Sequence, residues 1–193
     1  MIMWCEELIH KYYADNPKLE EILLHHSRQV AYKAVGIAKA HPELHADVTF
    51  LFEAAMLHDI GIYLCNAPGI CCYGASEYIC HGYLGAELLR KEGYPRHADV
   101  AERHTGTGIT LEQIERENLP IPHQDFCPRT IEEQIVCYAD KFYSKSNLTR
   151  PKSLGRIRSS LARYGEESVE KFNEWHLRFR KTRKRQSTKT GSK

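Results

Sequence analysis

The chain has 193 residues, of which 42% are apolar and 27% are charged, and its net charge is +2. This composition indicates a soluble globular domain that is long enough to bury a substantial core. The apolar runs are all shorter than the roughly 18 residues needed to span a bilayer, so no membrane-spanning segment is predicted.

The N-terminus and the seven cysteines indicate the compartment. The sequence MIMWCEELIHKYY has early glutamates and no basic region, so we expect no signal peptide and a cytoplasmic protein. An odd number of cysteines in such a chain favours reduced thiols over disulfides. Four of the cysteines share one loop: Cys65, Cys71, Cys72 and Cys80. They lack the C-x2-C pairs of structural zinc sites, which favours packing over zinc binding.

The first strong helical pattern covers residues 17–40. It begins with Pro17, which suits the first turn of a helix. Apolar residues recur at intervals of three and four, so one face is expected in the core. His26 lies on that face in register with Val30, whereas its neighbour His25 does not.

A second helix is predicted over about residues 47–59. It ends with His58 and Asp59, and Gly61 is suited to terminate it because glycine tolerates the left-handed conformation. A carboxylate buried at such a position without a partner destabilises the fold by several kcal/mol or more. A metal ion is one partner that removes this cost.

Loops and shorter helices complete the chain. Irregular loops are expected at 62–80 and 105–128, and helices at 81–95, 96–104, 131–143, 153–164 and 166–180. Thr130 and Glu133 have the spacing of a capping box at the start of the helix over 131–143. No strand pattern of period two and no internal repeat is present. These features predict an all-α fold.

The last 16 residues differ in charge from the rest. Residues 178–193 hold eight Lys or Arg and no acid, which leaves a net charge of −6 on residues 1–177 because the whole chain carries +2. A basic segment with almost no apolar residues after Phe179 is expected to be disordered. We therefore predict one domain over 1–177 and a basic tail over 178–193, the only segment expected to be able to contact nucleic acid.

Six ionisable residues lie on apolar faces or at helix ends near glycine. They are His26, His58, Asp59, His81, His104 and Asp140. A single histidine of this kind is more often a hydrogen-bonded core residue. Four histidines with two aspartates form a typical ligand set for one or two divalent transition metals. Fe or Mn is the expected metal, with Ni, Co, Zn and Mg as alternatives.

Five segments carry a resemblance to a known family. They are HSRQVA (26–31), AAMLHDIG (54–61), HGYLGAELL (81–89), RHTGTG (103–108) and YADKF (138–142). Over about residues 22–145 the chain resembles the HD-domain superfamily of metal-dependent phosphohydrolases, in its HDIG-bearing branch. The resemblance implies an HD-domain-like helical bundle. It also implies a first metal on His26, His58, Asp59 and Asp140, and a second metal on His81 and His104, with Asp59 as the bridge.

One position departs from the family pattern. Many HD hydrolases have a lysine three residues after the aspartate, where it meets substrate phosphate, but this chain has Ile62. Basic residues elsewhere must then contact the phosphate. The candidates nearest in sequence are Lys141, Lys145 and Arg103, followed by Arg90.

The resemblance implies hydrolysis of a phosphomonoester, a nucleotide or a dinucleoside polyphosphate by a metal-activated water, with Asp59, His58 and His104 as catalytic residues. Two alternatives remain open. Some HD proteins with the same six ligands are mixed-valence di-iron oxygenases, and Ile62 is compatible with that chemistry. The other alternative is a degenerate domain that only senses a nucleotide, although the complete ligand set argues against it. The sequence does not indicate an oligomeric state.

Overall fold

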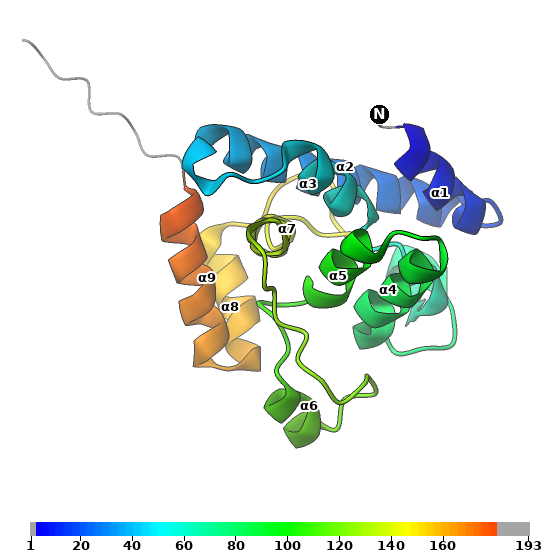
Figure 1. Ribbon diagram of the computed structural model, residues 1–193. Helices are drawn as coiled ribbons and strands as arrows, with labels where there is room; N and C mark the ends of the chain where they lie inside the picture. The colour runs from blue at the N-terminus through cyan, green and yellow to red at the C-terminus, as the bar shows by residue number, and fades with distance from the viewer. Residues whose placement is uncertain (1–2, 181–193) are drawn as a thin grey trace, which may run out of the picture.

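The computed structural model describes residues 3–180 and consists mainly of α-helices (Figure 1). In chain order these are α1 (Met3–Tyr13), α2 (Pro17–Ala40), α3 (Val48–Leu57), α4 (His81–Lys91), α5 (Pro95–Arg103), α6 (Leu111–Glu117), α7 (Ile131–Asp140), α8 (Leu154–Leu161) and α9 (Glu166–Phe179). The strands β1 (Asn66–Ala67) and β2 (Cys72–Tyr73) pair antiparallel. The 3-10 turns are η1 (Pro42–Leu44), η2 (Ile62–Leu64), η3 (Pro68–Ile70), η4 (Tyr78–Cys80) and η5 (Ala162–Tyr164). The fold is all-α, as predicted.

Helix α2 forms one wall of the core, and its predicted range of 17–40 is confirmed. Asn16 caps it by accepting a hydrogen bond from the backbone N–H of Leu19 at 3.2 Å, and Pro17 occupies its first turn. The apolar side of α2 packs against α3 and α7. His26 lies on this side and is buried.

The turn after α3 brings α3 and α4 close together. Gly61 does not adopt the left-handed conformation that was expected of it, since its φ is −84°. Glycine is needed there for a different reason: a Cβ would lie 2.3 Å from the carbonyl oxygen of His81 and 2.4 Å from the backbone nitrogen of Gly85. Helix α4 therefore packs directly on this turn, which places His81 beside Asp59.

Helix α7 carries the last of the six ionisable residues. Thr130 caps it by accepting a hydrogen bond from the backbone N–H of Glu133 at 3.2 Å. The Glu133 carboxylate accepts from the N–H of Arg129 at 2.7 Å, one residue before the donor in a capping box. The helix ends at Asp140 rather than at residue 143, so the Asp140 carboxylate stands at a helix end.

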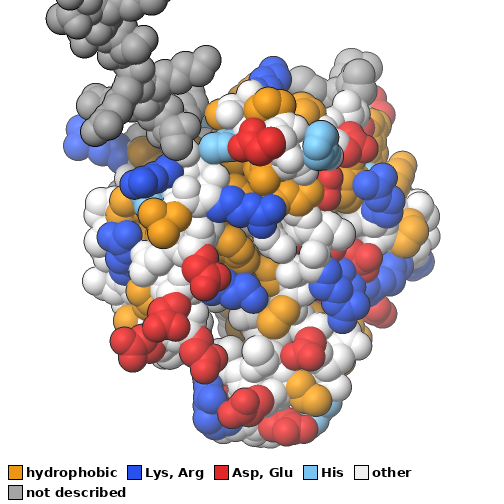
Figure 2. All heavy atoms as spheres, turned by 60° about the vertical axis from the view of Figure 1, so that its left-hand side comes forward, with side chains coloured by type: hydrophobic (Ala, Val, Ile, Leu, Met, Phe, Trp, Pro, Cys, Tyr) orange, Lys and Arg blue, Asp and Glu red, His pale blue; other side chains and the backbone are white. Residues whose placement is uncertain are grey.

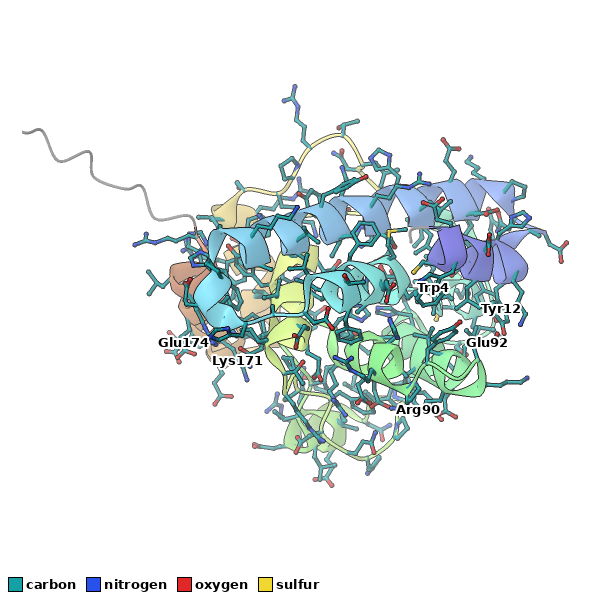
Figure 3. All side chains as sticks on the ribbon, turned by 45° about the horizontal axis from the view of Figure 1, so that its top comes forward. Trp4, Tyr12, Arg90, Glu92, Lys171 and Glu174 are labelled. Carbon is teal, nitrogen blue, oxygen red and sulfur yellow. The ribbon has the colours of Figure 1, made fainter. Side chains whose placement is uncertain are left out.

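Two helices lie in segments for which no helix was predicted. Helix α1 packs against α2 and α3. Trp4 stacks on Tyr94 with ring centroids 4.6 Å apart, and Tyr12 donates a hydrogen bond to Glu92, just after α4 (Figure 3). Helix α6, with Thr110 as its cap, lies within the predicted loop 105–128. It has seven residues, which is too short for apolar periodicity to stand out among the flanking prolines.

Helix α9 extends past the predicted end of the domain. Its residues Phe172, Trp175 and Phe179 are buried in the core. The expected boundary between residues 177 and 178 therefore falls inside α9, because Phe179 still contributes to packing. The rest of the predicted tail, residues 181–193, lies outside the described residues.

None of the helices described combines the length and the hydrophobicity that crossing a lipid bilayer requires.

Candidate metal centre

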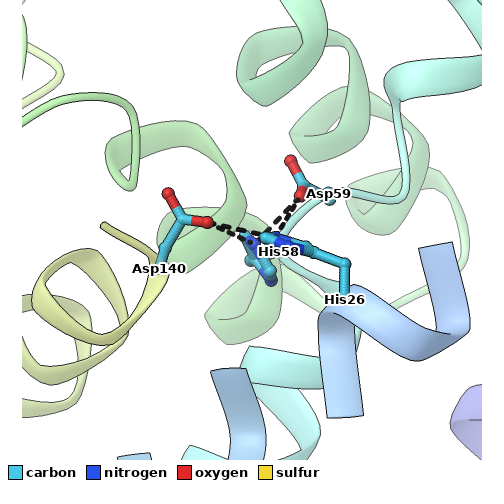
Figure 4. Close-up of side chains that lie close together, drawn as sticks. All are labelled: His26, His58, Asp59 and Asp140. Atoms are coloured by element: carbon cyan, nitrogen blue, oxygen red, sulfur yellow. Dashed lines mark ion pairs between the residues drawn. The ribbon is translucent and has the colours of Figure 1, made fainter. Parts of the chain in front are cut away.

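The structure brings the six predicted ligands together as two adjoining groups. The first group contains His26 from α2, His58 and Asp59 from the turn after α3, and Asp140 from the end of α7 (Figure 4). The Nε2 atom of His26 lies 3.1 Å from Oδ2 of Asp59 and 3.0 Å from Oδ1 of Asp140. The Nε2 atom of His58 lies 3.0 Å and 3.6 Å from the same two oxygens.

The second group contains Asp59 again, with His81 and His104. The Nε2 atoms of His81 and His104 lie 3.4 Å and 3.3 Å from Oδ1 of Asp59. One carboxylate oxygen of Asp59 thus faces each group. This arrangement suits a carboxylate that bridges two cations.

Hydrogen bonds select the tautomer of three histidines. The Nδ1 atoms of His58, His81 and His104 lie 2.7, 2.6 and 2.7 Å from the carbonyl oxygens of Ala55, Tyr78 and Ala101. A carbonyl oxygen only accepts, so each Nδ1 carries the proton and donates it. Each Nε2 then faces the centre and presents a lone pair when its ring is neutral, which is the state in which imidazole binds metals.

Several buried polar atoms at the centre have no uncharged hydrogen-bond partner. The Nε2 atoms of His81 and His104 are 3.0 Å apart with two lone pairs facing each other. The Nε2 atoms of His26 and His58 and both carboxylate oxygens of Asp59 are buried without a hydrogen bond. The ammonium of Lys145 reaches Oδ2 of Asp59 at 2.5 Å, so the cluster already attracts a cation. Buried polar atoms of this kind fit a metal site.

The charges of the centre shift its pKa values. Burial acts to raise the pKa of Asp59, but the charges of His58 and Lys145 outweigh it and hold that pKa well below its usual range. Burial lowers the pKa of His58, but Asp59 and Asp140 outweigh this and raise it to about 9. Burial and the neighbouring His104 lower the pKa of His81 to about 3. Burial also lowers that of His104.

Metal affinity is expected to rise about tenfold per pH unit between pH 6.5 and 9, because binding must displace one proton from His58, whose pKa rises from 6.5 to about 9. The raised pKa also stabilises the metal-free fold below pH 6.5, and this contribution is lost as the pH passes about 9. Isothermal titration with Mn(II) at several pH values measures the slope. An affinity independent of pH would contradict the assignment of His58.

Comparison with known proteins identifies the fold family. Residues 23–144 match the HD domain family. The chain belongs to this family. HD domains bind divalent metals, and the match supports membership of a superfamily of metal-dependent phosphohydrolases, which agrees with the predicted resemblance. Metal identity does not follow from the match.

Relatives and a solved structure add to this. A protein of Thermoplasma volcanium named tRNA (cytidine(56)-2'-O)-methyltransferase is 34% identical over 72% of this chain and 36% of its own length, so the chain spans about a third of that relative. An uncharacterised protein of Methanocaldococcus jannaschii is 36% identical over 58% of this chain and 59% of its own. The structure is also similar to the HD domain of the Listeria monocytogenes phosphodiesterase PgpH, with a TM-score of 0.50 and 17% identity. The superposition covers 86% of this chain and 93% of the PgpH chain, and it supports the fold alone.

A pocket of about 490 Å³ opens above the candidate ligands of this HD domain. His81, His104 and Asp140 form part of its wall, together with Lys141, Lys145 and Lys152. A second, more open pocket of about 360 Å³ adjoins it. The two share Tyr78, Asp140, Lys145 and Lys152.

The predicted phosphate-binding residues separate into two sets. Lys141 and Lys145 line the larger pocket. Arg103 does not line it, because its guanidinium is 3.1 Å from Glu133 and 3.4 Å from Asp99. Arg90 forms hydrogen bonds of 3.0 and 2.9 Å to Glu102. These two arginines hold α4, α5 and α7 together.

Two residues of the pocket were not predicted. Tyr78 stacks on His81 with ring centroids 4.7 Å apart. Lys152 lines both pockets from the segment between α7 and α8. No motif or periodicity marks either residue, and the density of positive charge after Asp140 is the signal that could have indicated Lys152.

Proposed function

We propose that this HD domain hydrolyses a phosphate ester, such as a phosphomonoester, a nucleotide or a dinucleoside polyphosphate, with one or two divalent metals held by the six ligands. One observation carries the proposal: the Asp59 carboxylate faces both ligand groups beneath a pocket that three lysines line. Divalent metals at such ligands supply Lewis-acid activation of a phosphoryl oxygen and a water of lowered pKa.

The ligands of this chain are prepared for that role. His81 and His104 present Nε2 lone pairs, since their Nδ1 protons are donated to backbone carbonyls. His58 presents one after metal binding displaces its second proton. Asp59 is inaccessible to solvent, which keeps water from competing for its oxygens. We assign His58, Asp59 and His104 to holding the metals rather than to proton transfer while both metals are bound.

Lysines replace the missing phosphate contact. Ile62 is fully buried and does not line the larger pocket. Lys145, from the loop after α7, reaches the centre from another direction and contacts Asp59. A cation there can move to a substrate phosphate when metals neutralise the carboxylate. Lys145 supports a hydrolase over the oxygenase alternative, with which the missing lysine at position 62 is compatible.

The methyltransferase name belongs to a relative about three times as long as the matched segment. Methyl transfer is not part of the proposal, because the pocket described here lies over a His and Asp cluster. Such ligands suit hard or borderline metals and phosphoryl chemistry.

Anaerobic hydrolysis is the test of the proposal. The Mn(II)-loaded protein is expected to release phosphate or nucleotide from at least one member of a panel of phosphomonoesters, phosphodiesters and nucleotides without oxygen. Lewis-acid catalysis needs no change of oxidation state, so Mn(II) or Co(II) should replace iron. No release from any member, together with oxygen uptake by the iron-loaded protein, would favour the oxygenase instead.

A further inference from the structure

The segment after the last ligand is strongly basic. Residues 141–165 contain seven Lys or Arg and no Asp or Glu. They are Lys141, Lys145, Arg150, Lys152, Arg156, Arg158 and Arg163. The segment covers the loop after α7, helix α8 and η5, and it supplies part of the wall of both pockets.

Most of these cations have no carboxylate partner. Lys141 pairs with Asp140, and Lys145 pairs with Asp59. Within residues 3–180, the other five form no ion pair. Arg158 is directed to α9, where its Nε donates to Asn173 at 2.8 Å. Arg150 and Arg156 are exposed. Figure 2, which brings the side of α8 and α9 forward, shows Lys and Arg side chains exposed on this face, interspersed with Asp and Glu side chains.

A phosphate at the metal ligands has space on two sides. The pockets of about 490 and 360 Å³ meet at Asp140, Lys145 and Lys152. The smaller pocket continues over Tyr143, Ser144 and Ser146, and its only acid is Asp140. A phosphomonoester carries one organic group on its phosphorus, whereas a phosphodiester carries two, which extend in different directions. The two pockets therefore fit a diester.

Aromatic side chains accompany the cations. Tyr164 lines the larger pocket although 48% of its surface is exposed. Tyr143 lines the smaller pocket. Tyrosine rings spaced along a basic groove are a pattern that binds single-stranded nucleic acid, because bases stack on the rings while the cations track the backbone.

We propose that the substrate is a single strand of nucleic acid, with its terminal nucleotide in the larger pocket and the adjoining strand along the smaller pocket towards Arg150 and Arg156. The proposal rests on the hydrolase function above and goes beyond the expectation that only the tail contacts nucleic acid. In the reaction, the oxygen of water bonds to phosphorus and the phosphorus–oxygen bond to the leaving nucleotide breaks. The proton of water passes to the leaving oxygen, so the products are a phosphomonoester and an alcohol.

The test measures binding of fluorescent ten-nucleotide RNA and DNA strands of one sequence to the full chain by anisotropy. The double variant Arg150→Glu/Arg156→Glu reverses two charges that touch no ligand. It is expected to bind both strands at least about tenfold more weakly, since two phosphate contacts and their counterion release are lost. The matched control Lys18→Glu/Lys91→Glu changes the net charge equally at exposed lysines that line neither pocket. It should bind within twofold of wild type.

Hydrolysis of bis(4-nitrophenyl) phosphate separates the two proposals, because Arg150 and Arg156 line neither pocket and a small diester needs only the pockets. Both double variants should keep wild-type turnover on it. Equal weakening by both double variants, or binding of anionic vesicles or polyphosphate in preference to either strand, would overturn the nucleic-acid proposal. If the wild-type protein binds the strands but hydrolyses no diester, the hydrolase proposal is overturned instead. If Arg150→Glu/Arg156→Glu loses more affinity for RNA than for DNA, the bound strand is identified as RNA.

Discussion

Asp59→Asn is expected to remove both bound metal and turnover. Its two oxygens face the two ligand groups at 3.0 to 3.4 Å from four histidine Nε2 atoms. Asparagine keeps the shape but loses the negative charge and one oxygen ligand. Turnover should fall by more than the roughly 10–100-fold that follows loss of a hydrogen-bond partner of a ligand. Elemental analysis and a phosphate-release assay measure the two effects.

Asp99→Asn is the matched control, because Asp99 is a partly exposed carboxylate of α5 that pairs with Arg90 and Arg103 and belongs to neither ligand group. It should keep its full metal content. Circular dichroism shows whether each variant folds. An Asp59→Asn protein with full metal occupancy and activity would refute the metal centre.

His81→Ala with His104→Ala is expected to lower the metal content from about two ions per chain to about one. The double variant removes every member of the second group except Asp59. The first group keeps His26, His58, Asp59 and Asp140, which still form a set of four ligands. Removal also relieves the contact of two lone pairs at 3.0 Å, so the fold should persist without metal.

Metal counting after dialysis against Mn(II) decides the outcome. Exposed His10 and His123 belong to neither group, and their replacement by Ala should leave the count unchanged. A double variant at residues 81 and 104 that retains two ions would show that the two histidines are structural. Loss of both ions would show instead that the two groups bind metal only together.

Local sequence patterns were sufficient for the helices that carry the ligands. Asn16 and Pro17 predict the start of α2, and the three- and four-residue spacing of its apolar residues places His26 inward. The order of the motifs also predicted the six residues that the structure gathers into two groups. Such signals are readable because helix capping and one-sided burial act within a few residues along the chain.

Tertiary packing decided the rest. Arg103 directly precedes His104 in sequence, yet its guanidinium pairs with Glu133 from α7. Lys152 instead reaches the pocket from a segment without any motif. Gly61 is required because α4 packs on its backbone, which its own conformation does not reveal. The resemblance implied that Asp59 is shared between two groups, but the distances from its oxygens to four histidines depend on how α2, α4, α5 and α7 meet. Distances between side chains on different helices are set by helix packing, and periodicity along one helix carries no information about them.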